Sequence, residues 1–182
     1  MLLALALVAL LAGTAALSLG GLRRGAKLDQ GLPDFETVLR MARADASGSG
    51  KRLRIAFEDG GLTTRVLIEN QPLSEPETFA DYLSCTWLNQ APNGLLRVER
   101  CELVGASAYA AVRADRPGRG AERDAMPSLT FYPDGSSDSA VIVLLSAEQS
   151  DERRGVVELD GLNGIIRTRI LTPSEYEEEF GD

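Results

Sequence analysis

Hydrophobic residues fill the start of the chain without interruption by charge. The first charged residue is Arg23, and residues 2–12 are apolar on every face of a helix, unlike an amphipathic core helix. At about 1.5 Å per residue, such a segment reaches roughly 30 Å, the thickness of a bilayer's hydrocarbon core. The pattern predicts a transmembrane helix at residues 1–22. Its apolar surface comes chiefly from Leu2, Leu3, Leu5, Leu7, Leu10 and Leu11.

A cleavable secretory signal is the alternative for this segment, with the small residues 13–16 as the cleavage region. A signal normally has a basic start and a shorter apolar core, so the membrane helix is favoured. Both alternatives export the rest of the chain. The positive charges of Arg23, Arg24 and Lys27 follow the apolar run, and by the positive-inside rule they would instead hold the remainder in the cytoplasm.

Residues 23–48 are predicted to form a hinge followed by an amphipathic helix. Several glycines and Pro33 weaken helix formation before Asp34, which can cap a new helix. Gly48 and Gly50 end it. Apolar residues recur on one face of this helix, namely Phe35, Val38, Leu39, Ala42 and Ala46.

The hydrophobic pattern then changes to a period of two, which predicts an antiparallel β domain over residues 49–172. Strands are expected at residues 53–57, 64–68, 95–103, 128–132, 140–145, 156–159 and 165–171. Ser74 and Glu77 resemble a capping box, so one or two helical turns are expected to bury Phe79, Tyr82 and Leu83. Residues 173–182 are expected to be a solvated acidic tail. The predicted fold class is α+β, an N-terminal helix packed on an antiparallel sheet.

Composition narrows the chemistry that the chain can perform. Its 182 residues amount to about one domain, and the net charge of −8 argues against binding of nucleic acid. The absence of histidine excludes histidine-based catalysis and histidine metal ligands, and two cysteines cannot form a four-ligand zinc site. We therefore expect no catalytic residue, no cofactor and no metal.

Two groups of residues have a structural and a functional interpretation. Cys85 and Cys101 could form a disulfide worth about 3 kcal/mol, or remain two buried thiols, and the bridge is slightly favoured. Asp134, Ser136 and Asp138 alternate as in a calcium loop, but the glycine and glutamate of an EF-hand are not in register, so a tight turn is favoured.

Other candidates are weaker. A local basic patch could bind DNA but is more typical of a solvated loop, the one expected at residues 114–126 and just before it. The patch comprises Arg113, Arg116, Arg119 and Arg123. The only tryptophan, Trp87, is expected in the core. A membrane-tethered enzyme is a further alternative and would need a pair of carboxylates for acid–base catalysis. The candidates Glu58, Asp59 and Asp160 each stand in a turn-like context, and none has a second carboxylate at a spacing that indicates such a pair.

Three segments together resemble type IV pilin-like proteins, most closely the minor pseudopilin H of type II secretion systems and the related FimT-type minor pilins. They are the apolar run 1–16, the helix end 38–46 with its Arg-Ala-acid-Ala pattern and following strand, and residues 129–136 with 156–167. The resemblance implies a non-enzymatic minor pseudopilin that serves protein export as a structural subunit. A FimT-type minor pilin of a pilus or competence system, or a tethered extracytoplasmic binding domain, is the alternative.

The resemblance also implies partners and a location. The expected partners are other pseudopilins in a hetero-oligomeric filament and the inner membrane, with no nucleic acid. The chain would cross the inner membrane once, with a methylated N-terminus and a periplasmic C-terminal domain. Family members begin with a basic leader, a glycine and a Phe-Thr-Leu-Ile-Glu-like start, whereas this chain opens at Met1 inside the apolar run. We expect upstream translation to supply that leader, which would place Arg23, Arg24 and Lys27 beyond the membrane.

Overall fold

A computed structural model describes residues 26–87, 94–105, 126–147 and 151–181. The predicted membrane helix at 1–22 lies outside these residues. Among the helices that are described, none combines the length and the apolar character needed to cross a membrane.

Two helices and eight strands surround the core of the described region. The helices are α2 (Ala26–Ser49) and α4 (Pro173–Phe180), and the 3₁₀ turn η1 spans Asp59–Gly61. The strands are β1 (Leu53–Glu58), β2 (Thr63–Glu69), β3 (Phe79–Asp81), β4 (Leu96–Leu103), β5 (Leu129–Phe131), β6 (Ala140–Ser146), β7 (Arg154–Asp160) and β8 (Ile165–Leu171).

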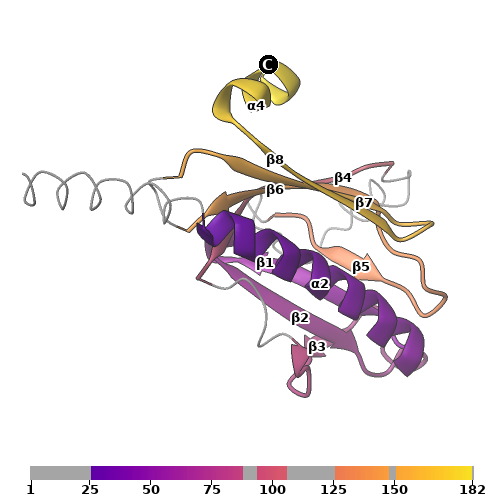
Figure 1. Ribbon diagram of the computed structural model, residues 1–182. Helices are drawn as coiled ribbons and strands as arrows, with labels where there is room; N and C mark the ends of the chain where they lie inside the picture. The colour runs from indigo at the N-terminus through magenta and orange to yellow at the C-terminus, as the bar shows by residue number, and fades with distance from the viewer. Residues whose placement is uncertain (1–25, 88–93, 106–125, 148–150, 182) are drawn as a thin grey trace, which may run out of the picture.

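The strands form two sheets rather than the single sheet that was expected. One has the order β3-β2-β1-β5 and the other β4-β6-β7-β8, and all neighbours are antiparallel. Helix α2 contacts strands of both sheets, while α4 lies beyond the second sheet, on the side away from α2 (Figure 1). The α+β class with an N-terminal helix on antiparallel strands is thus confirmed for the described region.

Helix α2 starts earlier than predicted. It is continuous from Ala26 through Pro33, so Asp34 lies inside the helix and does not cap it. Proline removes one backbone hydrogen bond and strains the preceding turn. Packing compensates, because Leu28 and Phe35, on either side of the proline, are both 0% exposed. The helix ends at Ser49, and Gly50 follows with a φ of +66°, as the glycine pattern predicted.

Gly31 allows α2 to approach the second sheet closely. A Cβ atom at this position would lie 2.5 Å from the Cγ atom of Leu96 in β4. The glycine that weakens helix propensity in the sequence therefore creates the helix–sheet contact in the fold. A similar close approach occurs at Gly155 of β7, where a Cβ would lie 2.9 Å from the Cδ1 atom of Leu32.

The hairpin predicted around residues 59–61 is confirmed, since β1 and β2 pair from Leu53↔Ile68 to Glu58↔Thr63. The helical turn predicted after Ser74 is wrong. Its hydroxyl donates to Gln71 instead of capping a helix, and the chain continues into strand β3. The edge of β2 provides backbone partners for β3. Leu83, expected to be buried, is 94% exposed.

The expected acidic tail is also wrong in part, because residues 173–180 form helix α4. Thr172 and Glu175 form a capping box, and Pro173 occupies the first turn, where its missing N–H has no helical partner to lose. No residue of α4 is buried. The segment is therefore solvated, as expected, but helical.

Candidate functional site

Several predicted site residues lie outside the described residues. These are the membrane-helix leucines Leu2, Leu3, Leu5, Leu7, Leu10 and Leu11, and the arginines Arg113, Arg116, Arg119 and Arg123. The remaining candidate residues lie in the described domain.

The cysteines are the described residues for which a covalent role was predicted. Cys85 follows β3 and Cys101 lies in β4; they are 8% and 5% exposed, and no disulfide joins them. In this structure the two residues are separate, buried thiols, and the bridge between them stays a prediction. Burial raises the pKa of Cys101 to about 12, so its sulfur stays protonated at neutral pH. This thiol packs in the core.

The carboxylates considered for catalysis each bind a local partner rather than one another. Glu58 accepts from Arg65 at 2.7 Å, Asp59 from Thr63 at 2.8 Å, and Asp160 from Asn163 at 2.9 Å. The Asn163 hydrogen bonds lower the pKa of Asp160. Within the described residues, no three His, Cys, Asp or Glu side chains are grouped to hold a metal ion. The carboxylates stabilise strand ends and turns.

The calcium-like segment is a tight turn. Asp134 accepts hydrogen bonds from the backbone and hydroxyl of Ser136, which lower its pKa, and Gly135 has a φ of +82°. Asp138 accepts from the backbone N–H of Thr130 at 2.8 Å and from the hydroxyl of Tyr132 at 3.3 Å. The two carboxylates therefore have separate structural partners in the turn.

The C-terminal half of α2 holds the loops at one end of the domain. Arg43 donates through Nε to the carbonyl of Gly135 at 2.5 Å and through Nη1 to that of Asn163 at 2.9 Å. Gly164 has a φ of +65°, and a Cβ there would lie 0.9 Å from Arg43 Nη1, so the turn beside Asn163 is shaped around this guanidinium. These contacts give the Arg-Ala-acid-Ala pattern a structural role that the sequence alone did not reveal.

The acidic residue of that pattern holds a different segment. Asp45 accepts a hydrogen bond from Trp87 Nε1 at 3.1 Å, and Trp87 packs against the core. Burial, followed by the hydrogen bond to Asp45, raises the pKa of Tyr82. Trp87 is thus partly buried and packs against the core rather than inside it, and Asp45 anchors its indole N–H.

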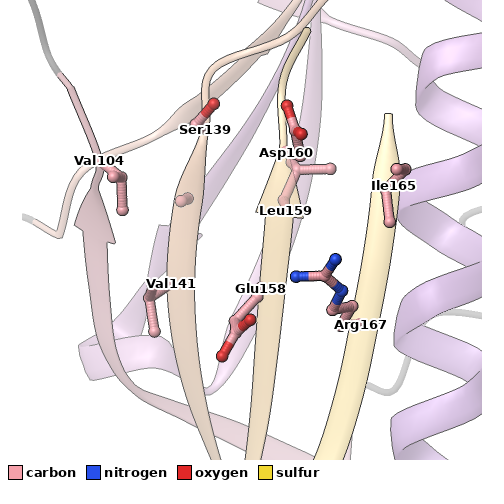
Figure 2. Close-up of a pocket in the computed structure, with 9 residues that line it drawn as sticks. Val104, Ser139, Val141, Glu158, Leu159, Asp160, Ile165 and Arg167 are labelled. Atoms are coloured by element: carbon pink, nitrogen blue, oxygen red, sulfur yellow. The ribbon is translucent and has the colours of Figure 1, made fainter. Parts of the chain in front are cut away.

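A shallow hollow lies on the outer face of the second sheet. Its volume is about 300 Å³, and it lies across β6, β7 and β8, beside the end of β4 (Figure 2). Val104 and Ile165 expose 56% and 48% of their surface at its sides, and Glu158 and Arg167 extend from neighbouring strands. The hollow combines apolar walls with charges of both signs.

Helix α4 is fixed beside this hollow on the same face of the sheet. Arg169 of β8 bonds Glu158 at 2.8 Å and Glu179 of α4 at 2.5 Å, and the Arg154 guanidinium lies 4.3 Å from the Tyr176 ring centroid. The sequence did not predict this attachment, because Arg169 and Arg154 lie 10 and 22 residues before their partners Glu179 and Tyr176 and show no local periodicity with them.

A second recess lies between α2 and the edge strand β8. Its volume is about 360 Å³. Its walls include Leu39 and Ala44 of α2 and Ile166 of β8, and Arg40 and Arg43 stand on the helix side. These two depressions lie on opposite faces of the sheet at β8.

Comparison of the sequence with known protein families and with curated proteins gives no match. The fold is similar to that of the minor pseudopilin EpsH from the type 2 secretion system of Vibrio cholerae, with a TM-score of 0.50 and 16% sequence identity. The alignment covers 82% of this chain and 98% of that chain. A second crystal structure of EpsH aligns with a TM-score of 0.49 and 15% identity over 81% of this chain and 99% of that chain.

The chain therefore has a minor pseudopilin-like fold, which confirms the resemblance at the level of the fold. The alignment includes nearly the whole of the EpsH chain, so the likeness concerns the complete arrangement of helix and sheets rather than one shared hairpin.

Proposed function

We propose that this protein is a non-enzymatic minor pseudopilin, a structural subunit of a type II secretion pseudopilus that takes part in protein export. The observation that carries the proposal is the fold shared with EpsH over 98% of that chain. The local partners of Glu58, Asp59 and Asp160 agree with a structural role, because these carboxylates hold turns and strand ends.

In this proposal the globular domain lies in the periplasm and residues 1–22 anchor the chain in the inner membrane. The apolar sequence of that segment supports the anchor. Other pseudopilins are the proposed partners, and α2 leads from the anchor into the domain. The mixed apolar and charged depressions on either side of β8 supply surfaces for such contacts.

Deletion of the gene in the source organism, with complementation by the full chain, tests this proposal. We expect type II substrates to accumulate in the periplasm of the deletion strain, and complementation to restore their release. Release of a periplasmic marker controls for envelope damage. Normal secretion with loss of pilus-dependent motility or DNA uptake would instead identify a FimT-type minor pilin. Normal behaviour in all three assays would leave a tethered extracytoplasmic domain and contradict the proposal.

A further inference from the structure

Strand β8 presents an open edge. Within the described part of the chain it pairs only with β7, although it is seven residues long, or about 23 Å. Arg167, Thr168 and Arg169 in its centre are all exposed. The other edge of the sheet, β4, is covered by η1, since a Cβ at Gly61 would lie 2.0 Å from the Val98 carbonyl oxygen. Of the two edges, β8 is therefore the one available for pairing.

The recess beside β8 lies where an added strand would place its side chains. Figure 2 shows β8 as the last strand of the sheet, and α2 packs against the inner face of that sheet, where it contacts β4, β6, β7 and β8. The recess of about 360 Å³ runs between α2 and β8 and is lined by the apolar side chains of Leu39, Ala44 and Ile166. Because strand residues alternate between faces, every second residue of an added strand would point toward this recess.

The charges around the edge select the chemistry of a partner. Arg167 and Arg169 point to the outer face of the sheet, where Arg169 is already paired with Glu158 and Glu179. Arg43 stands beside the recess, and its guanidinium is bonded to neutral carbonyl oxygens. A second copy of this chain fits poorly. Antiparallel pairing centred on Thr168 would place Arg167 opposite Arg169 of the other copy, and like charges at directly opposed positions destabilise a sheet.

We propose that the edge of β8 binds an extended segment of a partner protein by strand addition, and that this segment alternates acidic and apolar side chains. Its acidic residues lie beside Arg167 on the outer face, because Arg169 is already bonded to Glu158 and Glu179. Its apolar residues enter the recess between β8 and α2. Backbone hydrogen bonds to the edge provide the affinity, and the alternation provides the specificity. The inference goes beyond the proposed function, because it follows from this chain's own edge strand, recess and charges.

A synthetic peptide tests the inference independently of any secretion system. The probe has the sequence Gly-Glu-Val-Glu-Ile-Glu-Val-Gly with blocked ends. It is titrated into the isotope-labelled full chain in detergent micelles, with amide chemical shifts recorded by NMR. We expect saturable shifts concentrated in β8 and in the part of α2 around Arg43, with an affinity that falls as salt increases. A peptide with lysine at every glutamate position, and one with N-methylated backbone amides, are expected to bind at least tenfold more weakly.

Two variants of the protein locate the site. Arg167→Glu on β8 is expected to weaken peptide binding at least tenfold. Arg97→Glu, which changes an exposed arginine on the opposite edge strand β4, is expected to leave the affinity within twofold. Circular dichroism and Trp87 fluorescence verify that both variants fold. Absence of binding at millimolar peptide, shifts outside β8 and α2, or equal binding of the lysine peptide would each overturn the inference.

Discussion

Gly31 and Gly48 occupy the same helix but have opposite surroundings, so the same substitution should have opposite effects. Alanine is favoured over glycine inside a helix by about 1 kcal/mol. At Gly48 a Cβ would meet no atom within 4 Å. Because Gly48 is next to the last residue of α2, we expect Gly48→Ala to raise the free energy of unfolding by about 0.5 kcal/mol.

At Gly31 the same methyl group meets the side chain of Leu96. Its Cγ, Cδ2 and Cδ1 atoms would lie 2.5, 2.9 and 3.0 Å from the new Cβ. Leu96 is 3% exposed and cannot turn into solvent. Overpacking of this kind costs about 1–3 kcal/mol, which exceeds the gain in helix propensity. Gly31→Ala is therefore expected to lower the free energy of unfolding by about 1 kcal/mol.

Urea unfolding of the full chain in mild detergent, followed by the fluorescence of Trp87, measures both changes. A combined Gly31→Ala and Leu96→Ala variant provides a further check. We expect its loss to be smaller than the sum of the two single losses, because alanine lacks all three carbons that meet the new methyl group. Stabilisation of similar size by Gly31→Ala and Gly48→Ala would refute the assigned contact between α2 and β4.

Three further changes test other contacts. Arg52→Met removes the ionic partner of Glu69, whose side chain is 0% exposed. We expect the free energy of unfolding to fall by about 3 kcal/mol, the lower end for a buried pair, because Arg52 is 25% exposed. Adding Glu69→Leu should restore most of this loss in urea unfolding. Arg43→Met should cost about 2 kcal/mol and accelerate amide exchange in residues 133–139 and 161–164, and unchanged exchange there would contradict its assigned role. Hydrogen bonds from the Thr172 N–H and hydroxyl lower the pKa of Glu175. The α4 cap is therefore complete above about pH 5 and is lost as the pH falls through the folded-state pKa. The α4 amides should exchange faster at acidic pH, and this acceleration should be much smaller in Glu175→Gln.

Local patterns predicted the strands well because each has its own alternation. The hairpin of β1 and β2 and the strands β4 to β8 agree with the expected segments within a few residues. The apolar face of α2 was also predicted, since its spacing is visible without knowledge of the partner. The α+β class follows from these periodicities alone.

The errors occur where distant contacts decide the local structure. In the sequence, Pro33 and Gly31 predict a break in the helix. In the structure, Leu28 and Phe35 pack on the sheets and α2 stays continuous. The segment around Phe79 has a helical spacing, but the edge of β2 pairs with it as a strand. In both cases the deciding partner is a strand that local sequence patterns do not place beside the segment.

The surfaces around β8 were not predicted for the same reason. They are formed by α2, β6, β7 and β8 together, and only the fold brings Arg43 next to Ile166 and Arg167 next to Glu158. The Arg-Ala-acid-Ala pattern marked this part of α2 in the sequence. The structural role of its arginine depends on two loop carbonyls more than ninety residues away, which the sequence does not place beside it.

Site-specific photo-cross-linking in living cells of the source organism tests the pseudopilin proposal most directly. A photoreactive residue replaces exposed Met41 on α2, Ile165 beside the outer hollow, or Leu73, which is 99% exposed after β2. The account predicts adducts with other pseudopilins from at least one of the first two positions, identified by mass spectrometry. Folded protein at native abundance that forms no adduct with any pseudopilin from any of the three positions would contradict it.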